Sequence, residues 1–277
     1  ANFSEFLFPV RRFDCTREES RKNTPAASLE APSDGSLEEI LQREGDKIAA
    51  VIIEPVLQGA GGMILWPSES LVEIRELCDR YGTLLIADEV FTGFGRTGRL
   101  FACEHGPIVP DIICLSKALT AGYMPLAVTL ATAEIYNSFL SEDRGKTFFH
   151  GHSYTANALA CAVALENLDI LEDEDILGRI SRIEELFKER VQKLESLPAV
   201  RSTRAIGSLA ALDIEAGDSA EGGYLDAIGP RLYAEFLERD ILLRPLGNVL
   251  YFLPPYVITD DEIHRVFDAI EEVVGGL

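Results

Sequence analysis

An acid and an amine each follow a short apolar run, and they are the first residues of this chain that could do chemistry. Residues 84–87 lead to Asp88, and residues 112–115 lead to Ser116 and Lys117. Strands of a parallel sheet that is buried on both faces read as continuous apolar runs, and ligands bind at their carboxyl ends. We therefore predict that Asp88 and Lys117 lie at the same edge of a parallel sheet.

This pair suits carbonyl chemistry on a cofactor. We expect the apolar residues after Lys117 to desolvate its amine partly, and desolvation makes an amine a nucleophile toward carbonyls. A carboxylate at a strand end needs a partner, and a protonated pyridine nitrogen would serve Asp88. A lysine that binds an aldehyde and an aspartate that holds a pyridinium are what pyridoxal phosphate requires. Two simpler alternatives stay open: Lys117 extends into solvent, or Asp88 pairs with Arg96 or Arg99.

The composition excludes several classes of protein. Among 277 residues, 46 are acidic and 25 basic, and a net charge of −21 argues against binding to nucleic acid or to an anionic membrane surface. No apolar run reaches the roughly 18 residues of a membrane span. The five cysteines form no C-x-x-C motif, so we expect a reducing compartment, cytoplasmic or mitochondrial, and no structural zinc. His150 and His152 lack a visible third ligand and are interpreted as loop histidines rather than metal ligands.

The remaining pattern predicts an α/β unit followed by a smaller α+β unit. Capping-box sequences at Ser36 and Thr259 mark two helix starts. Expected strands cover residues 48–53, 84–87, 112–115, 125–131, 208–214, 241–244 and 250–253. Expected helices begin at residue 36, run from Ser68 to Gly82, cover residues 133–140, 157–171, 176–197 and 224–239, and begin again at residue 259. We divide the chain into an irregular surface excursion (1–35), a large domain (36–165) and a small domain (166–277).

One glycine motif invites a misreading. Residues 93–98 spell G-x-G-x-x-G after a strand. A dinucleotide-binding fingerprint needs its glycines to open a long helix, with an acid roughly 20 residues further on. Here acids precede the glycines and two prolines follow closely, so we exclude a nicotinamide or flavin site.

Three motifs together resemble a known family. Glu54-Pro55 after a strand, Asp88-Glu89-Val90 with the turn at 93–98, and Ser116-Lys117 resemble the core signature of class III pyridoxal-phosphate aminotransferases. Their order and spacing match from about residue 36 onward. The resemblance implies the fold-type-I fold of pyridoxal-phosphate transferases, with a partial large domain and a C-terminal small domain. It also implies a homodimer.

The resemblance implies a role for each matching residue. Lys117 would form the Schiff base with pyridoxal 5'-phosphate and move the proton between substrate and cofactor. Asp88 would pair with the pyridine nitrogen, and Val90 would pack on a ring face. Ser153 would place its hydroxyl on the cofactor phosphate of the neighbouring subunit. Glu54 would help to position the cofactor.

Four further stretches resemble the branch that aminates 8-amino-7-oxononanoate in biotin biosynthesis. They are residues 58–63, residues 101–105 with 110–112, residues 150–154, and residues 243–247 with Tyr251 and 254–256. By this resemblance Arg244 would bind the substrate carboxylate, as a bidentate guanidinium does well, while Tyr251 and Gly151 would line the substrate. The expected amino donor is S-adenosylmethionine. The alternatives are another class III enzyme (an ω-amino-acid aminotransferase or a semialdehyde aminomutase) and a catalytically silent piece of such an enzyme.

The resemblance is incomplete at the start of the chain. Members of the family are longer, and their N-terminal part carries a glycine and serine cup for the phosphate and an aromatic residue that stacks on the cofactor. Residues 1–35 spell neither, and the chain begins Ala1-Asn2-Phe3 without an initiator methionine or a secretory signal. We therefore expect a segment of a longer protein that holds the covalent and electrostatic half of the site.

Overall fold

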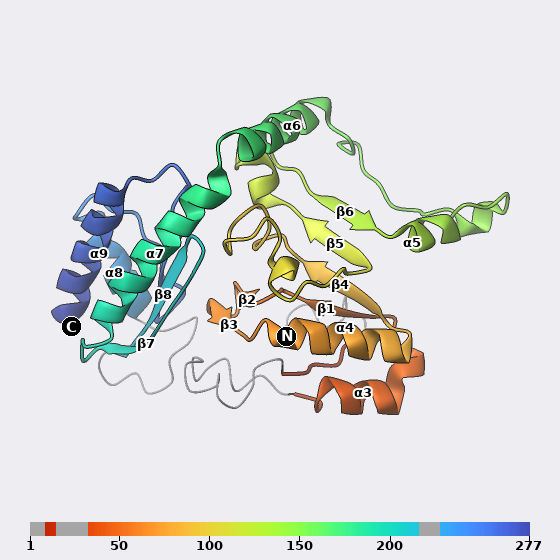
Figure 1. Ribbon diagram of the computed structural model, residues 1–277, viewed down its shortest axis with the longest axis horizontal. Helices are drawn as coiled ribbons and strands as arrows, with labels where there is room; N and C mark the ends of the chain where they lie inside the picture. The colour runs from red at the N-terminus through yellow and green to blue at the C-terminus, as the bar shows by residue number, and fades with distance from the viewer. Residues whose placement is uncertain (1–8, 15–32, 216–227) are drawn as a thin grey trace.

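A four-stranded sheet supports the edge at which the candidate residues were expected. The computed structural model describes residues 9–14, 33–215 and 228–277 (Figure 1). Strands β1 (Ala50–Ile53), β4 (Leu84–Asp88), β5 (Ile112–Leu115) and β6 (Val128–Ala131) lie in the order β1-β4-β5-β6. The first three are parallel, and β6 is antiparallel to β5. Ile53 pairs with Ala87, and Ala87 with Ile113, so the carboxyl ends of the parallel strands are level.

Two helices close one face of this sheet. Helix α3 (Leu37–Glu44) begins at the predicted capping box, in which Ser36 and Glu39 bond each other's backbone N–H groups. Helix α4 (Glu69–Tyr81) ends at Gly82, whose φ of 65° suits a residue without a Cβ. Their apolar sides pack on the strands in one core, in which Leu71, Cys78 and Leu85 are fully buried. Figure 1 shows both helices along the same side of the sheet.

Shorter elements complete the first part of the chain. A small antiparallel hairpin, β2 (Leu57–Gln58) and β3 (Ile64–Leu65), encloses the glycine-rich turn. The helices after β6 are α5 (Ala133–Ser138) and α6 (Ala158–Asp173). The 3₁₀ helices are η2 (Gly45–Lys47), η3 (Ala102–His105), η4 (Lys117–Thr120) and η5 (Arg144–Lys146).

A second sheet with its own core forms the C-terminal part. Strands β7 (Val200–Ile206), β8 (Leu209–Ile214) and β9 (Val249–Phe252) are antiparallel in that order. Helices α7 (Ile176–Leu194), α8 (Ile228–Leu237) and α9 (Asp260–Gly275) pack on it (Figure 1). Phe187 and Phe267 are fully buried between these layers, and their rings meet edge to face with centroids 5.4 Å apart. The predicted capping box at Thr259 opens α9.

The expected strand at 241–244 is wrong. This segment joins no ladder, and the residue nearest to it that pairs is Leu246, which forms an isolated bridge to Val249. Its alternation of buried and exposed residues reflects packing: Ile241 and Leu243 face the core, whereas Leu242 is 74% exposed. Strand β7 was missed because charged residues interrupt its apolar pattern, and pairing with β8 decides its conformation.

Several predicted boundaries move inward. The helices expected to end at residues 140 and 197 end at 138 and 194, and β6 begins at 128 rather than 125. The start of the helix expected over 224–239 lies outside the described residues. So does most of the excursion expected over 1–35, of which residues 9–14 and 33–35 are described.

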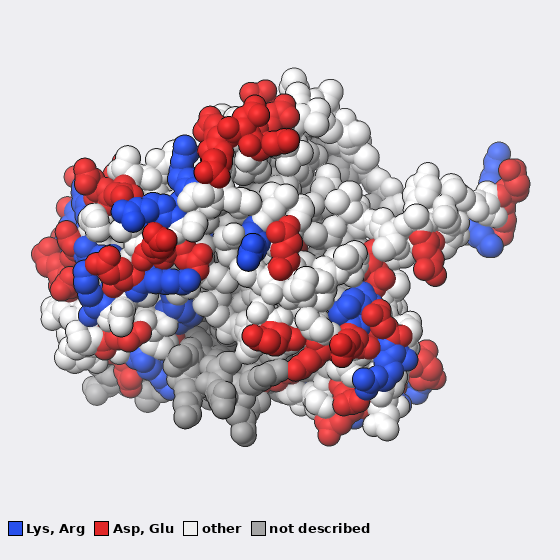
Figure 2. Space-filling view, viewed as in Figure 1, with Lys and Arg blue, Asp and Glu red and all other residues white. Residues whose placement is uncertain are grey.

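An arm made of α5 and the connection to α6 extends away from the sheet (Figure 1). Every residue from 136 to 156 is exposed, including large apolar side chains such as Phe149 at 83% and Tyr154 at 75%. Figure 2 shows that uncharged side chains dominate the middle of this arm, whereas charged residues cover much of the rest of the same face, including an acidic group over the end of α6. In the described ranges no helix is long and apolar enough to cross a membrane.

Candidate active site

The carboxyl edge of the parallel strands brings three of the predicted residues together. Glu54 follows β1, Asp88 ends β4, and Ser116 and Lys117 follow β5. Asp88 pairs in register with Cys114, and Ile53 with Ala87, so Glu54 lies beside Asp88. The placement that the sequence predicted for Asp88 and Lys117, at one edge of a parallel sheet, is therefore observed.

Asp88 offers a carboxylate without a described cationic partner. The residue is half-buried, and its Oδ1 accepts the N–H of Val90 at 3.1 Å. The alternative pairing with Arg96 does not occur. Arg96 instead donates to the hydroxyl of Ser208 at 2.7 Å and the carbonyl of Pro254 at 3.1 Å. Because a half-buried carboxylate is costly without compensation, Asp88 is suited to receive a cation from outside the described residues.

Glu54 adds a second carboxylate that resists ionisation. Its Oε2 accepts the N–H of Gly59 at 2.9 Å. Burial raises the pKa of the Glu54 carboxyl above its ordinary value, and the nearby charge of Asp88 raises it further. The hydrogen bond from Gly59 and the positive charge of Lys117 act in the opposite direction. The edge therefore carries two neighbouring carboxyl groups and one amine.

Lys117 is held in an unusual backbone conformation. Its φ is 45°, in the left-handed region that costs a residue with a Cβ about 1 kcal/mol or more. Ser116 donates its hydroxyl to the carbonyl of Leu126 at 2.7 Å, and the amide of Asn167 on α6 donates to the carbonyl of Ala118 at 2.9 Å. These bonds fix η4 from both sides. Backbone strain that the surroundings enforce is a common mark of functional sites.

The side chain of Lys117 is more exposed than the sequence predicted. Leu119 is buried, but Ala118 is only half-buried and Lys117 itself is exposed, so the expected partial desolvation is wrong for the described chain. The ammonium lies over an aromatic ring instead: Nζ is 4.9 Å from the centroid of Phe91. An amine in this position is accessible to a carbonyl group that approaches the edge.

Ser153, expected to hold the cofactor phosphate, and Gly151, expected to line the substrate, do not join this cluster within the described chain. Gly151 and Ser153 lie in the exposed connection between α5 and α6. Hydrogen bonds of this connection are local, such as that from the N–H of His152 to the hydroxyl of Thr155 at 3.1 Å. Val90 is half-buried, two residues after Asp88, and donates its N–H to the Asp88 carboxylate.

Two of the three residues expected at the substrate share a cavity in the C-terminal part, and the third, Gly151, does not line it. Arg244 and Tyr251 line a hollow of about 650 Å³ together with apolar residues that include Leu242 and Val257, which are 74% and 72% exposed. Arg244 is exposed and forms no ion pair with another described residue. A separate hollow of about 300 Å³ lies at the sheet edge, lined by Phe13, Ile52, Ile53, Glu54, Gln58, Trp66 and Asp88.

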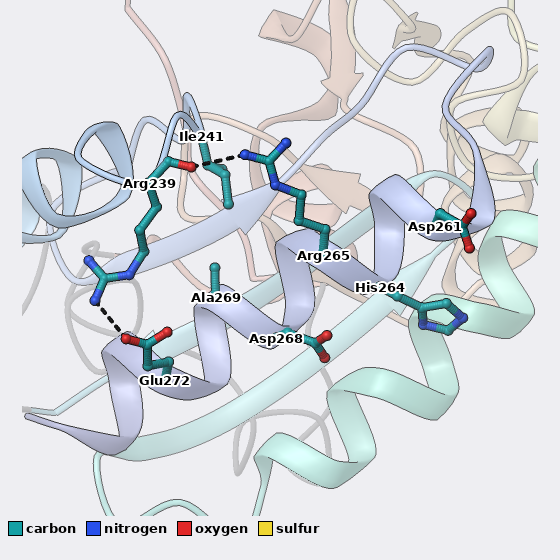
Figure 3. Close-up of a pocket in the computed structure, with 8 residues that line it drawn as sticks. All are labelled: Arg239, Ile241, Asp261, His264, Arg265, Asp268, Ala269 and Glu272. Atoms are coloured by element: carbon teal, nitrogen blue, oxygen red, sulfur yellow. Dashed lines mark hydrogen bonds and ion pairs between the residues drawn. The ribbon is translucent and has the colours of Figure 1, made fainter.

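A third hollow, of about 420 Å³, lies on the outer side of α9 and contains none of the predicted residues. Figure 3 shows that the two arginines of this hollow, Arg239 and Arg265, bind other residues that line it. Arg239 donates to the carboxylate of Glu272 at 3.0 Å, and Arg265 donates to the carbonyl of Arg239 at 3.1 Å. Because Arg239 is already paired with a carboxylate and Arg265 already donates to a backbone carbonyl, we do not place a ligand there.

Glu89 is a site-forming residue that the sequence analysis did not single out. Its fully buried carboxylate accepts the N–H groups of Ala102 and Cys103 at 2.9 and 2.8 Å and the hydroxyl of Thr92 at 2.5 Å. It thereby ties the turn after β4 to η3 and fixes the backbone that follows Asp88. The signal was a second acid directly after a strand, where an unpaired charge would be costly.

Comparison with known proteins places this geometry in a family. The model of the family Aminotransferase class-III matches residues 1–274. The adenosylmethionine-8-amino-7-oxononanoate aminotransferase of Geobacter sulfurreducens is 43% identical over 99% of this chain and 62% of its own length. The protein of the same name from Synechococcus elongatus is 46% identical over 83% of this chain and 53% of its length. The chain thus spans between about half and three fifths of these relatives.

Solved structures agree with the sequence relatives. The adenosylmethionine-8-amino-7-oxononanoate aminotransferase of Methanocaldococcus jannaschii gives a TM-score of 0.81 at 36% identity, over 86% of this chain and 56% of that one. A pyridoxal-phosphate-bound amine transaminase from an uncultivated Pseudomonas species gives 0.79 at 37% identity, over 86% and 55%. The predicted fold type I is thereby confirmed. Since the family match covers nearly its whole length, the chain belongs to the class-III aminotransferase family.

Proposed function

We propose that this protein is a pyridoxal-phosphate-dependent aminotransferase that converts 8-amino-7-oxononanoate to 7,8-diaminononanoate in biotin biosynthesis. One observation carries the proposal: Asp88, without a cationic partner in the described ranges, and Lys117 follow neighbouring parallel strands at one sheet edge. Family membership and the names of the relatives support the reaction.

The residues at this edge fit the reactive half of pyridoxal 5'-phosphate. When bound, the cofactor supplies an aldehyde that takes an amino group and a ring that accepts electrons. The Nζ of Lys117 would attach the aldehyde and carry the proton between reacting carbons. The uncompensated carboxylate of Asp88 would hold a proton on the ring nitrogen, because opposite charges stabilise each other in a half-buried site. Val90 would pack on the ring, and Glu54 would position it beside Asp88.

The substrate assignment rests on the cavity that contains Arg244 and Tyr251. A guanidinium without a described carboxylate partner is suited to the carboxylate of an oxononanoate, which it can bind with two hydrogen bonds. The exposed apolar side chains of Leu242 and Val257 offer a surface for the aliphatic chain of that substrate. We further propose S-adenosylmethionine as the amino donor, on the names of the relatives.

We also propose that the enzyme works as a homodimer. Gly151 and Ser153 lie on an exposed connection that also carries Phe148, Phe149 and Tyr154, exposed by 62%, 83% and 75%. Contiguous exposed apolar side chains favour burial against a partner. In a dimer this connection would bring Ser153 to the cofactor phosphate, and Gly151 to the substrate, of the other copy.

A reducing compartment, cytoplasmic or mitochondrial, completes the proposal. Cys78, Cys103, Cys114 and Cys161 are free thiols. Burial raises the pKa of the Cys78 thiol to about 11, so this thiol stays protonated and unreactive at neutral pH. Free, buried cysteines are typical of proteins kept in a reducing environment.

A titration with pyridoxal phosphate tests the cofactor assignment. The protein should develop a visible absorption band from lysine-bound cofactor, and an amino donor should bleach it. Lys117→Ala should abolish the band, whereas the exposed helix variant Lys188→Ala should retain it. A band that survives Lys117→Ala would show that a lysine other than Lys117 binds the cofactor. If the wild-type protein develops no band, the result would support the alternative that this chain is a catalytically silent piece of an aminotransferase.

Substrate competition tests the pocket. Arg244→Gln should raise the KM for 8-amino-7-oxononanoate by at least tenfold with little change in kcat, because a charge-assisted bidentate contact is lost. Arg265→Gln, in the same cavity, should leave the KM nearly unchanged. Equal turnover of an ω-amino acid and no response to Arg244→Gln would instead support another class III activity.

A further inference from the structure

We propose that Phe91 is a positioning residue whose ring, wedged in place by the turn at Gly59, holds the Lys117 ammonium at the sheet edge. The inference rests on the proposed function, because it takes Lys117 as the lysine that attaches the cofactor. It concerns two residues, Phe91 and Gly59, that have no role in the proposed chemistry itself.

The first step is the contact between Lys117 and the ring. Nζ of Lys117 lies 4.9 Å from the centroid of Phe91, within the roughly 6 Å over which a cation is attracted by an aromatic face. Glu54 and Asp88 lie at the same edge, but in the described ranges neither forms an ion pair with Lys117. The ring of Phe91 is therefore the group that meets the ammonium directly.

The second step is the wedge at Gly59. A Cβ on Gly59 would lie 2.9 Å from Cδ1 and 3.2 Å from Cε1 of the Phe91 ring, too close for carbon atoms. Gly62 in the same turn has a φ of 115° and is a glycine for conformational reasons, but the φ of Gly59 is not in the left-handed region. Gly59 is thus required for space, and its backbone is the surface against which the ring rests.

The third step is the rigidity of that backbone. The N–H of Gly59 donates to Glu54 at 2.9 Å, and its carbonyl accepts the N–H of Met63 at 3.0 Å. From the second sheet, Arg204 donates to the carbonyls of Gly62 and Met63, both at 2.6 Å. Because hydrogen bonds hold this turn from three directions, its backbone is rigid and restricts movement of the Phe91 ring.

The consequence concerns the lysine. An exposed lysine side chain has many rotamers, and most would carry the amine away from the edge into solvent. A fixed aromatic face favours the rotamers in which Nζ stays beside Glu54 and Asp88. Attachment requires Nζ close to the aldehyde: the ammonium first gives its proton to water or a neighbouring carboxylate, the neutral amine then adds to the carbonyl carbon, and the carbonyl oxygen leaves as water. Because the ring holds Nζ near the point of attack before that proton is lost, we expect it to raise the rate of cofactor attachment. It should leave the final absorption spectrum unchanged.

Nuclear magnetic resonance of the cofactor-free protein tests the contact. Reductive methylation with ¹³C-formaldehyde labels the lysines, and Lys117→Arg identifies the signal of Lys117. Its methyl resonance should be shifted upfield by the ring of Phe91. The shift should vanish in Phe91→Leu, persist in Phe91→Tyr, and shrink in Gly59→Ala. Phe101→Leu, a second half-buried phenylalanine that packs on Phe94, is the matched control and should retain it.

A kinetic measurement tests the consequence. On mixing with pyridoxal phosphate, Phe91→Leu should attach the cofactor about two- to fivefold more slowly than the wild type, as expected for loss of an exposed cation–π contact. Phe91→Tyr should restore the rate. An unshifted Lys117 signal in the wild type, or equal rates in all variants, would overturn the proposal. A shifted signal without any cofactor attachment would instead refute the proposed function while leaving the Phe91 contact intact.

Discussion

Arg204 on β7 and Asp213 on β8 form a buried bidentate ion pair. Nη1 and Nη2 of Arg204 lie 2.8 and 3.0 Å from the two carboxylate oxygens of Asp213, and the residues are only 8% and 1% exposed. The same guanidinium donates to the carbonyls of Gly62 and Met63. One charged group therefore joins the second sheet to the turn that borders Glu54 and Phe91.

Removing one member of this pair should be costly. Arg204→Leu leaves the Asp213 carboxylate buried without a counter-charge and frees two carbonyls, so we expect a loss of about 3–5 kcal/mol in the free energy of unfolding. The double variant Arg204→Leu with Asp213→Leu should lose less than Arg204→Leu alone. Urea denaturation of the three proteins measures this. A double variant that loses more stability than Arg204→Leu would mean that the two charges do not depend on each other.

Replacing the buried carboxylate of Glu89 with an amide should destabilise the protein. In Glu89→Gln one of the two acceptor oxygens becomes an NH₂ group that faces the N–H of either Ala102 or Cys103. An unsatisfied buried donor costs about 1–3 kcal/mol, so we expect a loss of that size. Glu104→Gln, an exposed acid that accepts only the N–H of Phe101, is the control and should change stability by less than about 0.5 kcal/mol. Equal effects of the two variants would contradict the clamp.

The strained backbone at Lys117 should lower the stability of the folded protein, because the site requires a lysine where glycine would fit the backbone better. Its φ of 45° favours glycine, so Lys117→Gly should be about 1 kcal/mol more stable than Lys117→Ala. The order should reverse at Lys188 in the middle of α7, where glycine is about 1 kcal/mol worse than alanine. Thermal unfolding of the four variants gives the comparison. The same order at both positions would show that the backbone at Lys117 is not strained.

The stability of the protein should fall with rising pH through Glu54. Burial raises the pKa of Glu54 in the folded state, so the folded protein holds this proton more tightly than the unfolded chain. The stabilising contribution is complete below the ordinary pKa of 4.5 and is lost as pH rises through the folded value. Glu54→Gln keeps an acceptor for Gly59 and removes the titration. It should therefore gain stability relative to the wild type as pH rises above 4.5.

Glu39 provides a control, because its pKa is shifted in the opposite direction to that of Glu54. Hydrogen bonds from the backbone and hydroxyl of Ser36 lower the pKa of Glu39, so its contribution is present above the ordinary pKa and is lost as pH falls. Glu39→Gln should lose stability relative to the wild type as pH rises through this range. The free energy of unfolding of the wild type, Glu54→Gln and Glu39→Gln, measured at several pH values, tests both expectations. Parallel pH profiles for both variants would contradict the assigned causes.

The local features of this chain could be predicted from sequence because neighbouring residues determine them. The capping boxes at Ser36 and Thr259 pair groups three residues apart, and Gly82 ends α4 through its own backbone. The apolar runs before Asp88 and Lys117 identify buried parallel strands, and parallel strands share an edge whatever surrounds them. The candidate pair therefore followed from the sequence alone.

The tertiary structure decided whatever depends on a distant partner. A ladder needs a second strand, so β7 forms beside β8 whereas the more apolar segment 241–244 stays unpaired. The ring of Phe91 between Gly59 and Lys117 joins segments far apart in the chain. Arg96 turned to Ser208 rather than to Asp88, eight residues before it, because the second sheet supplies closer acceptors. Spacing along a chain carries no information about such approaches, since packing between sheets creates them.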